Sequence, residues 1–430
     1  MSEEEFFSMF VEELREAVKS LPLPEPKSSW ARSLYLSKWN PHNASSKFKD
    51  VVVACDGSPS KSSFSGGLVA LVARAVAHIY KEDGLVENIP GFALKFDYKL
   101  MGRSLFMKTL EIEVLRKGIE RALEKHKHVF AVFDGSLYLT FFHYPPVLET
   151  IAEVFKKYVK ELSSLIKLTQ ENSVKILGIS KDSDISYLRA KIILDALLQA
   201  NPQIGDELAL RGRRIKWMAE RLRQKIDGLP EDALPRSYLK EFELEISDEE
   251  LYDEIASEPG FTTPLLLAPH TYFLREELKK KTMSWRESKF RRELERYEKL
   301  SSVIDALDNF YSLPPMAVFY WKPKHGLGVY RIDTPANLLG YIGKCGDLPE
   351  DVFTDNVGVE KSGQLVETLN SLSHAPYTVK PLTEVDAAVR LDRGLYKQAY
   401  EPVITEELRK KGFRVNPRKR SIRDLVLRGY

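Results

Sequence analysis

Two short segments of the chain end in the same tripeptide, Asp-Gly-Ser. A strand-like segment over 50–55, apolar from Val51 onward, precedes Asp56, and a continuously apolar run over 129–133 precedes Asp134. An aspartate at the carboxyl end of a strand directs its carboxylate into the crevice where ligands collect. Two such carboxylates on adjacent strands supply the oxygen ligands that Mg²⁺ and Mn²⁺ require. Two cations about 4 Å apart can activate water and stabilise the leaving oxygen in phosphodiester cleavage. Asp-Gly is also a common turn dipeptide, but its repetition suggests Asp56 and Asp134 as metal ligands.

A helix between the two tripeptides is the expected source of a third ligand. Residues 103–125 place Ile112, Leu115 and Ile119 on one apolar face. On a helical wheel Glu111 borders that face, whereas Glu113 lines up with the solvent side. We therefore prefer Glu111 as the third ligand and keep Glu113 as the alternative; either one can also be an ordinary surface glutamate.

The surrounding pattern predicts the elements that must position these carboxylates. Strands are expected at 50–55, 67–80 and 92–100, joined by two hairpins. After the helix at 103–125, apolar strands at 129–133 and 174–179 alternate with helices at 147–169 and 186–200. The order β-β-β-α-β-α-β predicts an α/β protein, with a mixed sheet flanked by helices as in a ribonuclease-H-like core.

The rest of the chain suggests additions to this core. Residues 203–312 show charged helical patterns and few β-branched runs, which predict a mainly helical insertion. A returning hairpin is expected at 317–321 and 328–332, followed by helices at 358–373 and 382–400. The predicted organisation is then a discontinuous core over 48–200 and 313–400. An N-terminal helix with a proline-rich linker over 1–26 precedes it, and a basic tail over 401–430 follows it.

Composition limits the class of protein. Of 430 residues, 43% are hydrophobic and 29% charged, which is typical of a globular protein. Apolar runs stay far below the ~20 residues that span a bilayer, the N-terminus is acidic, and two cysteines cannot build a disulfide framework. We therefore expect a cytoplasmic protein without a membrane anchor.

Charge is unevenly distributed although the formal net charge is only +2. Basic strips occupy 209–225, 279–292 and 409–430. Each strip is either a solvated surface or a site that attracts phosphates.

Four short blocks resemble the NurA nuclease family when they are taken in order. They are Val-Val-Ala-Cys-Asp-Gly-Ser at 52–58, Leu-Glu-Ile-Glu-Val-Leu at 110–115, Phe-Asp-Gly-Ser-Leu at 133–137 and Ile-Leu-Gly-Ile-Ser-Lys at 176–181. The likeness extends over about 48–200 and 310–400. It implies a ribonuclease-H-like fold and DNA cleavage with Mn²⁺, or with Mg²⁺ as the alternative. It also implies single-strand endonuclease and 5′→3′ exonuclease activities, and ring-like homodimers that dock on the hexameric HerA translocase in archaeal DNA-end resection and repair.

The resemblance also assigns roles to residues. Asp56, Glu111 and Asp134 would be metal ligands, and Lys181 would contact a phosphate. The family usually has a further histidine ligand on a C-terminal helix after a Pro-Leu pair. In this chain Asp386 stands where that histidine is expected. An aspartate also suits a hard cation, and the nearby His374 is the alternative ligand.

Other interpretations remain open. A protein of the same fold could bind DNA as a scaffold without cutting it, which the aspartate at 386 leaves possible, or it could cut RNA. Dinucleotide-binding and P-loop enzymes are disfavoured because their glycine motifs do not occur. For the nuclease we expect a homodimer whose positive channel is lined in part by the 209–225 and 279–292 strips. The N-terminal helix is a candidate element for docking a partner.

Overall fold

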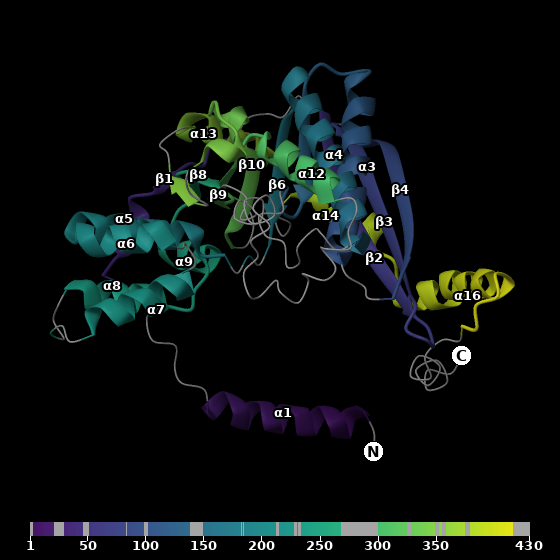
Figure 1. The fold of residues 1–430 in the computed structure, drawn as a ribbon, viewed down its shortest axis with the longest axis horizontal. Helices are drawn as coiled ribbons and strands as arrows, with labels where there is room; N and C mark the ends of the chain where they lie inside the picture. The colour runs from purple at the N-terminus through teal and green to yellow at the C-terminus, as the bar shows by residue number, and fades with distance from the viewer. Residues whose placement is uncertain are drawn as a thin grey trace.

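The computed structural model describes residues 3–20, 30–45, 51–82, 84–98, 102–137, 149–181, 183, 185–211, 215–227, 230, 234–267, 300–324, 328–348, 352–354, 358–374 and 379–415. Over these residues the strands form one mixed sheet with helices on its faces (Figure 1). The main strand order is β1-β7-β9-β10-β6-β5-β2-β3-β4, and β8 pairs with both β9 and β11.

The sheet begins with the expected meander. β2 (Val51–Ser63), β3 (Val69–Lys81) and β4 (Gly84–Asp97) pair in antiparallel order through two hairpins. β4 starts eight residues before the predicted strand because its first residues also pair with β3. β2 continues well past Asp56, so the prediction that a strand ends there is wrong: the polar segment after Asp56 extends by pairing with the apolar β3.

Two βαβ units follow and complete the core. α3 (Arg103–Leu123), β5 (Val129–Asp134), α4 (Glu149–Glu171), β6 (Lys175–Ser180) and α5 (Tyr187–Ala200) lie within a few residues of their predicted ranges. β5 is parallel to β2 and to β6. The spatial order β4-β3-β2-β5-β6 is that of a ribonuclease-H-like sheet, which confirms the predicted fold class.

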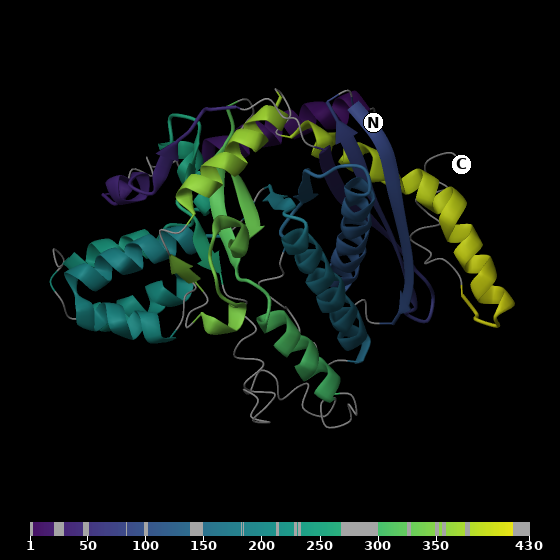
Figure 2. The same cartoon turned by 90° about the horizontal axis from the view of Figure 1, so that it is seen from above.

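Alternate residues of the central strands face two separate layers of helices. Val51, Val53 and Cys55 pack with α3 and α4, which lie side by side along one face in Figure 2. Val52 and Ala54 pack on the opposite face with α13 (Val359–Leu372) and α14 (Lys380–Val389). Both faces of these strands are therefore buried, as their continuous apolar sequences require.

The returning hairpin is present, and it extends the sheet beyond β6. β9 (Met316–Lys322) and β10 (Tyr330–Pro335) pair with each other, and β10 runs antiparallel to β6. α12 (Leu300–Tyr311) precedes the hairpin and packs on α4. Two short 3-10 helices, η1 (Ala336–Leu339) and η2 (Cys345–Asp347), follow it.

The second C-terminal helix is shorter than predicted. α14 ends at Val389, and Arg390 adopts an extended conformation. Asp392 then caps a new helical segment by accepting a hydrogen bond from the backbone N–H of Leu395. This segment consists of α15 (Arg393–Leu395), the π-helical η3 (Tyr396–Tyr400) and α16 (Glu401–Lys410). Residues 416–430 of the predicted tail lie outside the described residues.

The insertion is mainly helical but also contributes strands. Its helices are α6 (Pro202–Arg211), α7 (Ile215–Ile226), α8 (Leu234–Glu243) and α9 (Asp248–Ile255). β7 (Gly260–Thr262) and β8 (Leu265–Leu267) join the main sheet. These strands were missed because three residues carry no usable periodicity. The basic strip at 279–292 lies outside the described residues.

The remaining elements are short or peripheral. They are α1 (Glu3–Ser20), α2 (Arg32–Leu36), β1 (Trp39–Pro41) and β11 (Val352–Thr354). α1 is helical as predicted, with Phe6, Phe7 and Phe10 exposed. Among the described helices, none has both the length and the apolar character needed to cross a bilayer.

Candidate active site

Asp56 and Asp134 are neighbours across two parallel strands. Cys55 on β2 pairs with Phe133 on β5, so the aspartates that follow them occupy the same level of the sheet. Adjacent strands lie about 4.8 Å apart. β5 ends at Asp134, whereas β2 continues along β3. Asp56 therefore lies at the point where β2 stops pairing with β5. Both aspartates are partly exposed at this point.

The two glycines that follow the aspartates have different roles. Gly135 has a φ of 106°, a left-handed conformation that favours glycine, and it turns the chain away from the sheet. Gly57 stays within β2 and faces α3, where a Cβ atom would lie 2.0 Å from Met107 Cε and 2.6 Å from Glu111 Oε1. Its missing side chain therefore makes room for the Glu111 carboxylate.

α3 presents its two candidate glutamates to different surroundings. Glu111 is buried between the helix and the sheet, and burial raises its pKa. Glu113 lies toward solvent and forms ion pairs of 2.7 Å with Lys117 and 2.8 Å with Lys157. The structure thus brings Glu111 and not Glu113 toward the aspartates, in agreement with the helical wheel.

Four carboxylates share one electrostatic environment. The pKa of Asp56 is raised to about 7, first by burial and then by repulsion from Asp134, with further repulsion from Glu111 and Asp386. A hydrogen bond of 2.6 Å from the Gly57 N–H to Asp56 Oδ1 opposes this rise. The carboxylates come from β2, β5, α3 and α14, so four separate elements concentrate negative charge in one region.

Two lysines lie among these carboxylates. Lys181, in the loop after β6, donates a hydrogen bond of 2.9 Å to Asp134 Oδ2, and it is also attracted by Asp56 and Asp386. Lys108 is three residues before Glu111 on α3; its Nζ lies 3.7 Å from Glu111 Oε2 and donates to the carbonyl of Ser136. Lys108 was not predicted from the sequence, although its i,i+3 spacing from Glu111 was a usable signal.

A buried network fixes the loops that carry Asp134 and Lys181. The Ser136 hydroxyl donates to Asp333 Oδ2, and Asp333 pairs with Arg331 at 2.8 Å. Glu249 of α9 accepts hydrogen bonds from the backbone N–H groups of Arg331 and Ser183. These residues come from the returning hairpin and the insertion, and no local sequence pattern connects them to the site.

The oxygen atoms of these carboxylates are the type of ligand that a hard divalent cation prefers. All four candidate ligands are carboxylates, and the pKa of Asp56 is raised first by burial and then by acidic neighbours whose repulsion a cation would relieve. In the described residues, however, no three His, Cys, Asp or Glu side chains are close enough together to hold a metal ion. Asp134 instead pairs with Lys181, Glu111 lies beside Lys108, and Asp386 pairs with Arg390 at 2.8 Å.

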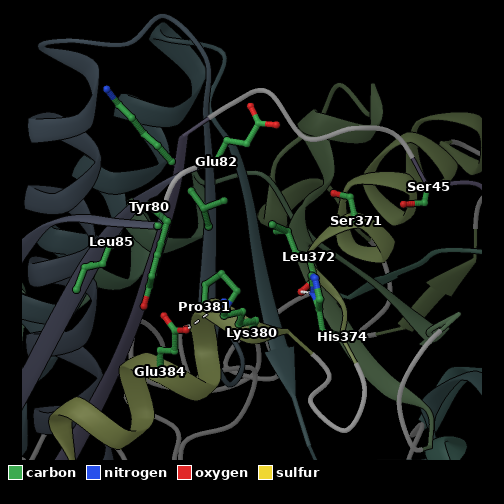
Figure 3. Close-up of a pocket in the computed structure, with 13 residues that line it drawn as sticks. Ser45, Tyr80, Glu82, Leu85, Ser371, Leu372, His374, Lys380, Pro381 and Glu384 are labelled. Atoms are coloured by element: carbon green, nitrogen blue, oxygen red, sulfur yellow. Dashed lines mark hydrogen bonds and ion pairs between the residues drawn. The ribbon is translucent and has the colours of Figure 1, made fainter.

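His374 lies in a different place from the carboxylates. It lines a cavity of about 590 Å³ together with Tyr80, Lys380 and Glu384 (Figure 3). The described lining of this cavity includes none of the four carboxylates. The cavity meets the first turns of α14, whereas Asp386 is further along the same helix. Asp386, and not His374, is thus the C-terminal candidate that shares the environment of Asp56.

Several solved structures resemble this chain, and the likeness is distant. The NurA nuclease from Sulfolobus solfataricus aligns over 96% of this chain and 98% of its own, with 14% identity and a TM-score of 0.44. A NurA bound to dAMP and manganese aligns over 94% and 96%, with 12% identity and a TM-score of 0.34. Ciona intestinalis endonuclease V in complex with DNA aligns over 85% and 95%, with 9% identity and a TM-score of 0.28. The comparison with curated proteins gave no match.

A family model gives the clearer result. The model described as the NurA domain matches residues 50–342, more than half of the chain. The matched segment contains Asp56 on β2, Glu111 on α3, Asp134 on β5 and Lys181 in the loop after β6. It also includes the residues of the expected insertion. The chain therefore belongs to the NurA family.

Proposed function

We propose that this protein is a metal-dependent nuclease that hydrolyses phosphodiester bonds in DNA. Its centre is the group of four carboxylates, Asp56, Glu111, Asp134 and Asp386. The observation that carries the proposal is the strand pairing that places Asp56 beside Asp134, with Glu111 against Gly57. Burial and these acidic neighbours raise the pKa of Asp56 to about 7. Clustering of buried and partly buried like charges is costly for folding and is characteristic of sites whose charges serve chemistry. Family membership supports the same conclusion.

Each group has a defined chemical role in this proposal. The carboxylates would hold Mn²⁺, or Mg²⁺, which would supply a water of lowered pKa and stabilise charge on the phosphate. Lys181 is partly exposed beside Asp134 and provides a cation for a non-bridging phosphate oxygen. Lys108 is buried against the Phe133 ring and remains inside the site, where it limits repulsion between Glu111 and Asp134.

A cleavage assay tests the proposal. An end-labelled single-stranded DNA is incubated with Mn²⁺ or Mg²⁺ and the wild-type chain, Asp56→Ala, Asp134→Ala, Glu111→Gln or Glu113→Gln. Wild type and Glu113→Gln should cut the DNA, because Glu113 is held by surface lysines. The other three variants should lose at least two orders of magnitude in rate. Equal activity of all five proteins would refute the assignment.

The same assay separates the alternatives. A DNA-binding scaffold would bind DNA in a salt-dependent manner and cut nothing with any divalent cation. An RNA-cleaving enzyme would prefer an RNA strand of the same sequence. Asp386→His, which restores the residue type usual in the family, tests the fourth ligand: activity equal to or above wild type supports a ligand at this position.

The proposal also includes the polarity and partners that the family suggests. These are single-strand endonuclease and 5′→3′ exonuclease activity, a homodimer, and docking on a HerA-type hexameric translocase during DNA-end resection. The exposed apolar side chains of α1 offer a contact for such a partner. If deletion of residues 1–26 leaves translocase binding unchanged, α1 is not the docking element.

A further inference from the structure

One face of the β2–β3–β4 meander is covered at both ends and open in the middle. Residues two apart on a strand share a face, and pairing places Asp56 beside Val76 and Ser58 beside Arg74. α14 covers the face on the side of Ala54, through the cluster that contains Val379 and Leu382. The α15–α16 segment covers the side of Ala70 and Val72 with Leu391 and Tyr396. Between these covers, Asp56, Val76 and Arg74 remain partly exposed, and the Ser58 hydroxyl accepts a hydrogen bond of 3.4 Å from the backbone N–H of Leu391 at the edge of the second cover.

The open face continues onto β4 as an exposed apolar row. Phe92 pairs with Arg74, Leu94 and Phe96 follow it on the same face, and Tyr98 comes directly after the end of the strand. These four residues form the aromatic strip, and their exposed fractions are 56%, 44%, 42% and 62%. The opposite face of β4 packs on the core through Ile89 and Ala93. An apolar row of this size on an edge strand is costly in water and marks a binding surface.

The rings next to the aromatic strip are held in a stacked arrangement. Tyr400 of η3 stacks on Phe92, with ring centroids 6.4 Å apart and planes at 24°. Tyr396 stacks on Tyr400 at 5.8 Å and 18°. The Tyr396 hydroxyl is fixed by a hydrogen bond of 3.0 Å with Ser62 on β2. Two segments far apart in the sequence thus present roughly parallel rings at one edge of the sheet.

Cations border this surface on the side of the carboxylates. Arg74 lies directly opposite Phe92, and Arg393 is exposed where α15 begins, whereas Arg390 is paired with Asp386 at 2.8 Å. Ser58, which pairs with Arg74, is two residues from Asp56, a step of about 7 Å along a strand. A protein partner would need only the apolar row. A nucleic acid strand would stack its bases on the rings, place its phosphates beside the cations, and lie along a surface that leads to Asp56.

We propose that the aromatic strip is a binding surface for single-stranded nucleic acid. Unpaired bases stack on Phe92 and Phe96, and phosphates pass Arg74 on the way to the carboxylates. Stacking on aromatic rings is tolerant of sequence and needs bases that are free of a duplex. This inference deepens the proposed function and rests on it, because it names the surface that holds the single strand and the path by which the strand reaches Asp56.

Binding without cleavage tests this inference. The full chain is kept in EDTA, and fluorescence anisotropy measures binding of an end-labelled oligothymidine and of a blunt duplex of equal length. Phe92→Ala and Phe96→Ala should each weaken single-strand binding about tenfold and leave duplex binding within twofold. Phe92→Trp should retain single-strand binding, and the indole fluorescence should be quenched by a stacked base.

Ile342→Ala is the matched control, because Ile342 is an apolar side chain that is 98% exposed elsewhere on the surface. It should change neither affinity. If Phe92→Ala binds the single strand as tightly as wild type, the inference is wrong. It is also wrong if sedimentation shows that Phe92→Ala separates a dimer into monomers, because a second copy of the chain then covers the aromatic strip.

Failure of the inference and failure of the proposed function are distinguishable. If Phe92→Ala binds the single strand normally and the protein cleaves DNA with a divalent cation, the inference about the aromatic strip is wrong and the proposed nuclease function stands. If Phe92→Ala weakens single-strand binding but the wild-type chain cleaves nothing with any divalent cation, the aromatic strip is a single-strand binding site and the proposed nuclease function is wrong.

Discussion

Cys55 on β2 lies directly opposite Phe133 on β5, and this one pairing brings Asp56 and Asp134 together. Both aspartates follow a buried residue on parallel neighbouring strands, so their side chains project from the same face at the same level. A shift of one residue in the register would turn one carboxylate to the α3 face. The electrostatic coupling of the two aspartates is therefore a consequence of strand pairing.

The Asp56 carboxylate should make the metal-free protein less stable as pH rises. Its folded pKa of about 7 lies above the ordinary 3.8, so the folded state binds the proton more tightly than the unfolded state. This contribution to stability is present below about pH 4 and is lost as pH rises toward 7. Asp56→Asn should remove the loss and stabilise the protein by about 1–3 kcal/mol at pH 8.

Urea unfolding in EDTA at pH 5 and pH 8 measures this effect. The difference in unfolding free energy between wild type and Asp56→Asn should be larger at pH 8 than at pH 5. A difference that is equal at the two pH values would show that Asp56 titrates normally.

Divalent cations should stabilise the folded chain through the same carboxylates. A ligand that binds only the folded state at 100 times its Kd adds about 2.7 kcal/mol. Mn²⁺ should therefore raise the Tm of wild type by a few degrees, and Asp56→Asn and Asp134→Asn should lose this rise. Glu113→Gln should keep it, since Glu113 pairs with surface lysines. The same rise in all four proteins would place the cation elsewhere.

Gly57→Ala should damage the site without adding or removing charge. The new methyl group would meet Met107 Cε at 2.0 Å and Glu111 Oε1 at 2.6 Å, so Glu111 must move away from the aspartates. We expect at least a tenfold loss of cleavage rate and a destabilisation of about 1–3 kcal/mol, as in other overpacked cores. Gly363→Ala is the control, because its nearest neighbours lie at an ordinary 3.7 Å; a loss of activity equal to that of Gly57→Ala would exclude the steric explanation.

Asp333→Ala should be strongly destabilising although Asp333 is not a candidate ligand. Its removal leaves Arg331 buried without its partner, and breaking a buried ion pair costs about 3–5 kcal/mol. Chemical denaturation measures the loss. The double variant Asp333→Ala/Arg331→Met should recover part of it, because no unpaired charge remains. A double variant as unstable as the single one would mean that the ion pair is not the cause.

The sequence alone was sufficient for the central elements and for three carboxylates. Apolar runs and helical periodicity predicted the meander and both βαβ units, because these patterns reflect which side chains are buried within a single element. The helical wheel selected Glu111 over Glu113 for the same reason. The strand that was expected to end at Asp56 was not predicted correctly, because the polar residues after it extend only through pairing with β3.

Only the tertiary structure decided which distant residues surround the carboxylates. Asp333, Arg331 and Glu249 reach the site through pairing of β10 with β6 and packing of α9, and neither contact leaves a local pattern in the chain. The short strands β7 and β8 were missed because their conformation depends on the neighbouring strand β9. Sequence periodicity records burial within one element, whereas the composition of a site depends on contacts between elements that are far apart along the chain.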